Sequence, residues 1–143
     1  MARYVTRIES RLSPSAAFAY MADFANARHW DPSVSAATLT SDGPVGLGST
    51  FHLVARFAGR DVPLLYSIAA YEPAQRVVFE ARKPGFVSRD TITIEPAGDG
   101  SIVDYDAVLE LSGARRIFDP ILQRIFNGVG RNATAGMRAA LNP

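Results

Sequence analysis

The central part of the chain, from Ser33 to Ser112, consists of short extended runs separated by turn residues, and this repetition limits the possible folds most. Polar and apolar side chains alternate within the runs, as they do in half-buried strands. The connections are short and rich in Gly, Pro and Asp, as in AGRD, KPG and EPAGDGS. Such connections join neighbours as hairpins, whereas parallel strands need long crossovers. The pattern therefore predicts six consecutive antiparallel strands.

One more strand and two short helices are expected before this region. The segment RYVTRIESRL alternates in the same way and predicts a first strand. In SPSAAFAYMADF, Ser13 suits the N-cap of a helix and Pro14 its first position. Asp23 can cap a second helical piece, FANARHW, which Pro32 ends because the residue before a proline avoids helical angles.

After Gly113 the apolar residues recur at three- and four-residue steps, which is typical of an amphipathic helix. They are Phe118, Ile121, Leu122, Ile125, Val129, Ala133, Gly136, Met137 and Ala140. A helix of about 24 residues is the only element long enough to cover the apolar face of a seven-stranded sheet. We therefore expect an α+β protein in which a seven-stranded antiparallel sheet curls around a long C-terminal helix, with two short helices between strands one and two.

Length and composition point to one ordinary domain, residues 1–143. The apolar content of 48% and the charged content of 20% are globular values, and the net charge of +1 does not predict a nucleic acid partner. No apolar run approaches the roughly 20 residues that cross a bilayer, and the first residues lack the apolar core of a signal peptide. We expect a cytoplasmic protein with no integral membrane segment.

Several kinds of chemistry lack their usual residues. The chain has no Cys and only two His, His29 and His52, so neither a disulfide nor a metal site of the usual ligand spacing is expected. The segment GPVGLGST has two of the three glycines of a dinucleotide fingerprint and joins two strands, which predicts a hairpin loop. No cofactor is expected.

Strand alternation places three polar side chains, Tyr66, Asp90 and Tyr105, among apolar residues on the inner face of the sheet. A curled sheet around one helix encloses more volume than modest side chains fill, which predicts a cavity. The full inward set is Phe51, Leu53, Ala55, Phe57, Val62, Leu64, Tyr66, Ile68, Val77, Phe79, Ala81, Ser88, Asp90, Ile92, Ile94, Val103, Tyr105, Ala107, Leu109 and Leu111.

These polar residues have alternative interpretations. The tyrosines either bond their hydroxyls within the core or contact a ligand. Asp90 is either a strand-end carboxylate that accepts a hydrogen bond from Arg89 or a turn, or a carboxyl group in a dry cavity. In a dry cavity its pKa would rise, and it could donate or accept a proton.

The terminal helix raises two further questions. Gly128, Gly130 and Gly136 weaken its interior, and they serve either close packing against the sheet or room for a ligand. Arg124, Arg131 and Arg138 form one stripe. A stripe of this kind is usually a solvated face, although it could contact an acidic partner or lipid head groups.

The segments WDPSV, GLGSTFHL, YEP, VVFEA and DTITIEPAGDGSIVDY, in this order, resemble the SRPBCC superfamily, also called the START-like or polyketide cyclase/dehydrase superfamily, which includes pollen allergens. The resemblance spans essentially the whole chain and implies the helix-grip fold with a deep apolar cavity. It places Trp30 beside the mouth of that cavity, as a gate or a plug, with its indole N–H reaching solvent or a carbonyl.

The leading expectation is a protein, monomer or homodimer, that binds a small hydrophobic molecule: a lipid, a polyketide or another aromatic or acyl metabolite. One alternative is a polyketide cyclase or dehydratase with Asp90 or Tyr66 as catalytic candidates. A second is a regulatory or interaction module that uses the basic face of the last helix. The residues expected to contact the ligand are Trp30, Phe51, Leu53, Tyr66, Phe79, Asp90, Ile92, Tyr105, Leu109, Leu122, Phe126 and Val129.

Overall fold

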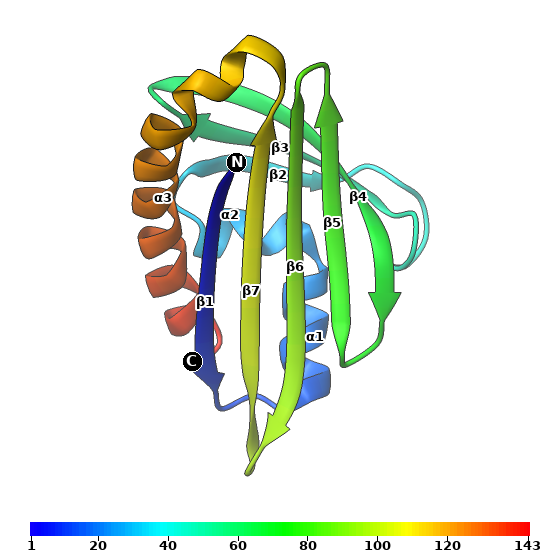
Figure 1. Cartoon of the computed structure of the whole chain (residues 1–143). Coiled ribbons are helices and arrows are strands. Elements are labelled where there is room, and N and C mark those ends of the chain that lie inside the picture. Colours follow the sequence, from blue (N-terminus) through cyan, green and yellow to red (C-terminus); the bar gives the residue numbers. More distant parts are fainter.

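A seven-stranded antiparallel sheet curls around one long helix in the computed structural model, which describes all 143 residues (Figure 1). The elements in chain order are β1 (Ala2–Ser10), α1 (Pro14–Ala22), the 3-10 helix η1 (Phe24–Asn26), α2 (Ala27–Trp30), β2 (Val34–Leu39), β3 (Thr50–Phe57), β4 (Arg60–Glu72), β5 (Arg76–Lys83), β6 (Phe86–Ala97), β7 (Gly100–Leu111), the 3-10 helix η2 (Gly113–Phe118) and α3 (Asp119–Ala140).

The strand order is β1-β7-β6-β5-β4-β3-β2, and every neighbouring pair is antiparallel. All neighbours except β1 and β7 are also consecutive in sequence, as short hairpins require. In Figure 1, α3 lies beside the edge strand β1. Strands β2 and β3 cross behind β1 and β7. Helix α3 contacts both β1 and α2. The predicted helix-grip architecture is confirmed.

The two short helices begin where their capping residues predict. The Ser13 hydroxyl accepts a hydrogen bond from the Ala16 N–H at 3.2 Å, and α1 begins at Pro14. The Asp23 carboxylate accepts one from the Ala25 N–H at 3.1 Å and caps η1. These side chains supply acceptors for amide groups that a helix start leaves unpaired.

Phe24, the first residue of η1, fills the closed part of the core. Its ring stacks on that of Phe79 at 4.0 Å between centroids and meets Phe51 and Tyr66 edge-on at 6.3 and 5.1 Å. Offset and edge-on aromatic pairs contribute beyond the area they bury. The core beneath η1 is therefore solidly packed, and any cavity must lie elsewhere along the inner face of the sheet.

The terminal helix begins later than predicted. It starts at Asp119, after the six-residue 3-10 helix η2, and Phe118 and Ile121, which belong to the predicted apolar repeat of this helix, do not pack in the core. They are 54% and 59% exposed, and the preceding Ile117 is 75% exposed. In Figure 1, η2 and the first turn of α3 lie at one end of the sheet.

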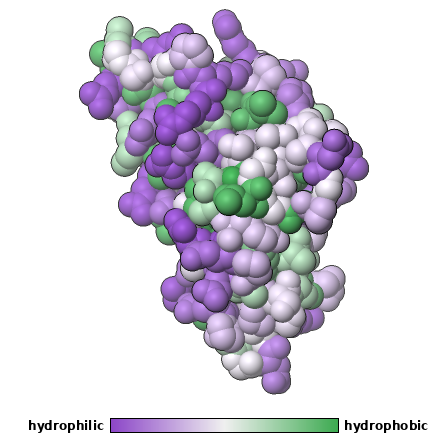
Figure 2. Space-filling view, turned by 90° about the vertical axis from the view of Figure 1, so that its right-hand side faces the viewer, coloured by the Kyte–Doolittle hydropathy of each residue, from purple (hydrophilic) through white to green (hydrophobic).

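The surface carries few apolar groups on the face seen in Figure 2. Apolar residues there form small groups, the most prominent near the middle, and hydrophilic residues flank them (Figure 2). None of the helices combines the length and the apolar character that spanning a bilayer requires.

Candidate functional site

A cavity of about 130 Å³ lies between the inner face of the sheet, α3 and the segment that joins η1 to β2. Its lining is mostly apolar and comes from every strand except β5, as well as from η1, α2 and α3. Arg56, at the β3–β4 hairpin, is exposed, and its neighbours Phe57 and Val62 are half-buried. The cavity therefore approaches solvent at this hairpin and is closed at the Phe24 side.

The cavity exists because small side chains occupy much of its wall. Protein cores are otherwise packed as densely as organic crystals, so a cluster of small residues on facing elements leaves space. The small lining residues are Ala27, Ser33, Ala55, Ser88, Ala107, Gly130 and Ala133.

Asp90 is a buried carboxyl group in the wall of this cavity. It lies on β6 between Phe79 of β5 and Ala107 of β7, and its Oδ2 accepts a hydrogen bond from the Tyr105 hydroxyl at 2.8 Å. Burial raises the pKa of Asp90 to about 7, although the Tyr105 hydrogen bond lowers it and the nearby Asp31 raises it further. Asp90 can therefore hold or release a proton near neutral pH.

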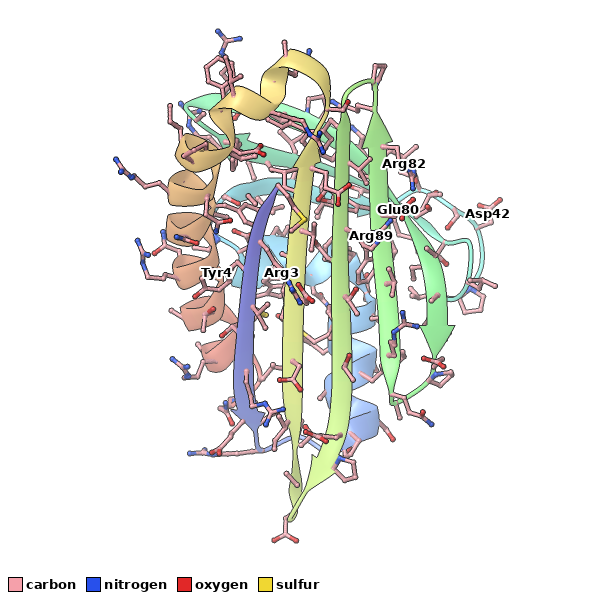
Figure 3. All side chains as sticks on the ribbon, in the orientation of Figure 1. Arg3, Tyr4, Asp42, Glu80, Arg82 and Arg89 are labelled. Atoms are coloured by element: carbon pink, nitrogen blue, oxygen red, sulfur yellow. The ribbon has the colours of Figure 1, made fainter.

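The alternative interpretation of Asp90, a carboxylate bonded to Arg89 or to a turn, is wrong. Arg89 points to the outer face of the sheet and donates to the Glu80 carboxylate at 2.9 Å. Arg82 shares that carboxylate, and Figure 3 labels the three residues close together on β5 and β6 (Figure 3). Hydrogen bonds from Arg82 and then Arg89 lower the pKa of Glu80. The outer and inner carboxylates of this sheet thus have opposite electrostatic environments.

Tyr66 holds a second polar pair in the cavity wall. Its hydroxyl shares a hydrogen bond with the Ser88 hydroxyl at 2.8 Å, although β5 separates their strands. The small Ala81, which pairs with Ser88, lets the tyrosine ring pass over β5. Burial and then the charge of Asp90 raise the pKa of Tyr66 well above its usual value, so the hydroxyl keeps its proton. Tyr66 and Tyr105 both bond within the protein and line the cavity as well.

Trp30 lies deep in the wall of the cavity rather than beside a solvent-filled mouth. The hydrogen-bond partner that was expected for its indole N–H is missing. Its side chain is 2% exposed, and its Nε1 is buried without a hydrogen-bond partner. The expectation that the indole N–H reaches solvent or a carbonyl is therefore wrong. The rings of Phe24 and Tyr105 contact the indole at 6.2 and 5.5 Å between centroids. A buried unpaired donor costs about 1–3 kcal/mol.

Asp31, which the sequence suggested only as a turn residue, also lines the cavity. Its Oδ1 accepts hydrogen bonds from the Ser33 N–H and hydroxyl at 2.9 and 2.7 Å, which fixes the turn as predicted. Burial raises its pKa, and the Ser33 hydrogen bonds lower it. The cavity wall thus carries two carboxyl groups from segments far apart in the sequence.

Eight of the twelve residues expected to contact a ligand line the cavity: Trp30, Leu53, Tyr66, Asp90, Tyr105, Leu109, Phe126 and Val129. The other four do not. Phe51, Phe79 and Ile92 belong to the solid core around Phe24, and Leu122 packs in a small separate cluster with Ala2 and Leu109. The lining also includes residues outside the expected ligand contacts, among them Tyr4, Phe24, Asp31, Val34, Leu64, Phe86 and Met137.

Two of the three helix glycines serve close packing. A Cβ at Gly136 would overlap the main-chain carbonyl of Trp30, and one at Gly130 would overlap the ring of Tyr4. In Figure 3, Tyr4 is labelled on the α3 side of β1. Gly128 has open space beside it, apart from the end of the Arg131 side chain. The packing interpretation therefore holds for Gly136, whereas Gly130 both packs against Tyr4 and lines the cavity.

The remaining candidates lie on the surface. His29 and His52 are exposed, and so are the arginines of the stripe on α3. No three side chains of the His, Asp or Glu type come together in a way that could hold a metal ion.

The family described as polyketide cyclase / dehydrase and lipid transport matches residues 1–142 of this chain. No curated protein matched it.

Solved structures with the same fold are distant in sequence. A START superfamily protein from Mycobacterium smegmatis has a TM-score of 0.80 at 12% identity, with 99% of this chain and 97% of that chain covered. The ginseng major latex-like protein 151 from Panax ginseng gives 0.73 at 12% identity, covering 99% and 98%. The di-domain ARO/CYC StfQ from the steffimycin biosynthetic pathway gives 0.74 at 10% identity, covering 98% of this chain and 50% of that one.

Proposed function

The chain belongs to the polyketide cyclase / dehydrase and lipid transport family, and from that membership and its cavity we propose that it binds one small, largely apolar molecule between the sheet and α3. The observation that supports this most is the cavity itself, which is apolar over most of its wall and has polar groups at a few fixed places. Binding sites for small molecules have this composition.

The volume limits the size of the guest. An apolar cavity of about 150 Å³ accommodates benzene, whereas drug-sized ligands occupy about 300–1,000 Å³. At about 130 Å³, this cavity suits a single ring or a short chain. A lipid or a poly-β-keto chain would have to move α3 or the β3–β4 hairpin outward.

We assign the contacts as follows. Leu53, Leu109, Phe126 and Val129 supply apolar surface, and Trp30 supplies a flat aromatic wall. Asp90, Tyr66 and Tyr105 orient the guest, because their polar atoms are already fixed by hydrogen bonds within the protein.

Intrinsic fluorescence tests this proposal, because the only Trp of the chain lies in the cavity wall. Titration with a one-ring apolar compound should change Trp30 emission saturably. Ala107→Leu, which fills the cavity, should abolish the change, while Ala139→Leu on the exposed side of α3 should leave it intact. Native mass spectrometry of the protein from its own host should reveal a bound small molecule. Equal binding by both variants would contradict the cavity as the site.

A second candidate function is that of a cyclase or dehydratase, and the Asp90–Tyr105 pair favours it. A carboxyl group with a pKa of about 7 can serve as a general acid or base at neutral pH. A carrier should tolerate Asp90→Asn and Tyr66→Phe with altered affinity only, whereas an enzyme should lose turnover by about a hundredfold or more.

We propose that the protein is cytoplasmic, that it is a monomer or a homodimer, and that it has no nucleic acid partner, as expected from the sequence. The interaction module remains an alternative, since the arginines on α3 are exposed. Such a module should still bind its partner when Ala107→Leu fills the cavity, and should fail to bind it with Arg124→Glu and Arg131→Glu.

A further inference from the structure

An exposed apolar group lies where η2 passes into α3. Its members are Ile117, Phe118 and Ile121, which are 75%, 54% and 59% exposed. Ile121 follows the other two by four and three residues, so the three side chains share one face. None of them lines the cavity. Single apolar residues scattered over a surface are ordinary, whereas a cluster of large ones marks an interaction site, so this end of the molecule has a contact surface that the cavity does not explain.

The charged side chains that border this apolar group are basic. Arg115 and Arg116 precede it on η2, and Arg124 follows it one turn further along α3. All three arginines are exposed, and none of them forms a salt bridge. Asp119, the one acid within the group, pairs with the amino group of Met1. The apolar group is thus bordered on both sides by cations that have no counter-ion in the protein.

Two neighbouring hairpins add further cations. In Figure 1 the β5–β6 turn lies at the same end of the sheet as η2, and it carries the exposed Lys83. The Arg115 side chain lies against this turn. The β3–β4 hairpin, with the exposed Arg60, reaches this end as well. Of the acids here, Asp61 belongs to an ion pair and Glu110 does not, so the basic character of this end is retained.

We propose that this end of the molecule docks on the surface of a bilayer that contains anionic lipids. The docking surface is the apolar group with the cations that border it: Arg115, Arg116, Ile117, Phe118, Ile121 and Arg124. Its apolar side chains enter the boundary between head groups and acyl chains, and its arginines pair with lipid phosphates. This inference goes beyond the proposed function, since no residue of the docking surface lines the cavity.

Charge and size favour a bilayer over another protein. A second copy of this chain would bring the same arginines face to face in a symmetric contact. A stable protein interface takes about 20–30 residues from each partner, whereas a bilayer accepts a few apolar side chains of any shape. The docking surface has the small apolar group and the cationic border that the second case requires.

Cosedimentation with lipid vesicles tests the docking. The protein should bind vesicles of equal parts phosphatidylcholine and phosphatidylglycerol, and it should bind phosphatidylcholine alone at least about tenfold more weakly. Added salt should weaken the binding, because it screens the arginines. Absence of binding to the anionic vesicles at low salt overturns the inference, and so does equal binding to both kinds of vesicle.

Variants of the docking surface separate its two parts. Arg115→Glu with Arg116→Glu should weaken binding to the anionic vesicles by about twentyfold or more, since each cation near such a surface contributes about fivefold. Phe118→Ser with Ile121→Ser should weaken it by about tenfold or more, through lost apolar burial. Unchanged binding by either double variant contradicts the proposed surface.

Matched controls lie elsewhere on the molecule. Leu47 is 72% exposed in the β2–β3 loop, which Figure 1 shows on the side of the sheet away from α3. Leu47→Ser should bind vesicles as the wild type does. Arg11 is exposed at the far end of β1, beyond a Debye length of about 8 Å from η2, so Arg11→Glu should change the affinity by less than about threefold. Losses in these controls as large as those at the docking surface overturn the inference.

A single fluorescent label locates the contact. The chain has no Cys, so Ile117→Cys introduces one attachment site for an environment-sensitive fluorophore. Anionic vesicles should shift the emission of this label to the blue, while the same label on Leu47→Cys should not respond. No shift at the first position, or equal shifts at both, overturns the inference.

Docking and ligand binding can fail independently. Ala107→Leu, which fills the cavity, should bind anionic vesicles as the wild type does, so a loss in that variant contradicts a docking surface separate from the cavity. Analytical ultracentrifugation tests the other occupant of the surface. A dimer that Phe118→Ser with Ile121→Ser dissociates would make this surface a subunit interface and would overturn the inference, while the proposed function would stand.

Discussion

Asp90 accepts one side-chain hydrogen bond, from Tyr105, and is otherwise enclosed by the sheet. In the unfolded chain a carboxyl group of this type ionises at its ordinary value of 3.8, whereas in the folded protein the pKa is about 7. Between these values the folded state holds a proton that the unfolded state has lost. The free energy of unfolding therefore decreases as the pH rises from about 4 to about 7, and the whole penalty is present above 7.

Asp90→Asn should remove this penalty, because the amide oxygen can still accept from Tyr105 and carries no charge. We expect the variant to match the wild type near pH 4 and to be more stable by about 2–4 kcal/mol at pH 8.5. Urea unfolding of both proteins across this range measures the difference. Asp104→Asn serves as the control: it breaks the ion pair with Arg7, and Asp104 is not among the charges that act on Asp90, so no gain at high pH should follow. A difference that does not change with pH would contradict the assignment.

Helix α3 supports the edge strand β1 through two amide side chains. Gln123 accepts from the Arg3 N–H at 2.8 Å and donates to the Arg3 carbonyl at 2.9 Å. Asn142, just beyond the helix, accepts from the Arg11 N–H and donates to the Glu9 carbonyl, both at 2.9 Å. These side chains satisfy main-chain groups that a neighbouring strand would otherwise pair.

Gln123→Ala and Asn142→Ala should each lower the free energy of unfolding by about 1 kcal/mol. The two sites are at opposite ends of α3, so the losses should add within about 0.5 kcal/mol. Hydrogen exchange gives a local check: the Arg3 amide should exchange faster only in the first variant and the Arg11 amide only in the second. Faster exchange at both sites in either variant would mean that β1 detaches as a unit.

Gly128 and Gly136 of α3 make a matched pair of positions for testing how closely the helix packs. Gly128→Ala places a methyl group in open space and should stabilise the protein by about 0.5–1 kcal/mol, because Ala favours a helix interior. Gly136→Ala forces a methyl group against the Trp30 carbonyl and should destabilise it by about 3 kcal/mol. Thermal unfolding of both variants measures the two effects. Similar gains for both would contradict the close contact between α2 and α3.

The strands, caps and sheet topology could be predicted because local patterns determine them. Ser13 and Asp23 cap the helices they precede, and the short turns leave only hairpins. The lining of the cavity was harder to predict. Strand alternation places Ala55 and Ala107 on the inner face, as the structure does, but it cannot distinguish them as cavity residues from bulky core residues such as Phe79. Where space remains depends on distances between segments far apart in the sequence, and alternation along one strand carries no information about those distances.

Across the whole molecule, one aromatic core connects the short helices to the sheet, and the cavity adjoins that core. Phe24, Trp30 and Tyr105 belong to the core cluster and also line the cavity. Filling or emptying the cavity therefore acts on the same packing that holds η1, α2 and β7 together. This continuity supports the proposal that residues 1–143 form a single domain.

A single domain should unfold in one cooperative step. Trp30 emission reports on the cavity wall and far-ultraviolet circular dichroism on the sheet, so urea transitions followed by the two signals should coincide. A saturating guest should shift both midpoints together, since it binds only the folded state. Two separate midpoints would contradict a single domain and would assign the short helices to a less stable unit.

The pairing of β1 with β7 has a consequence for biosynthesis. Ser10 pairs with Ser101, 91 positions later in the chain. At a translation rate of about 5–20 residues per second, the first strand waits roughly 5 to 20 s for its partner to be made. Its outward-facing Arg3, Arg7 and Glu9 keep that waiting segment hydrated and discourage it from adhering to other nascent polypeptides.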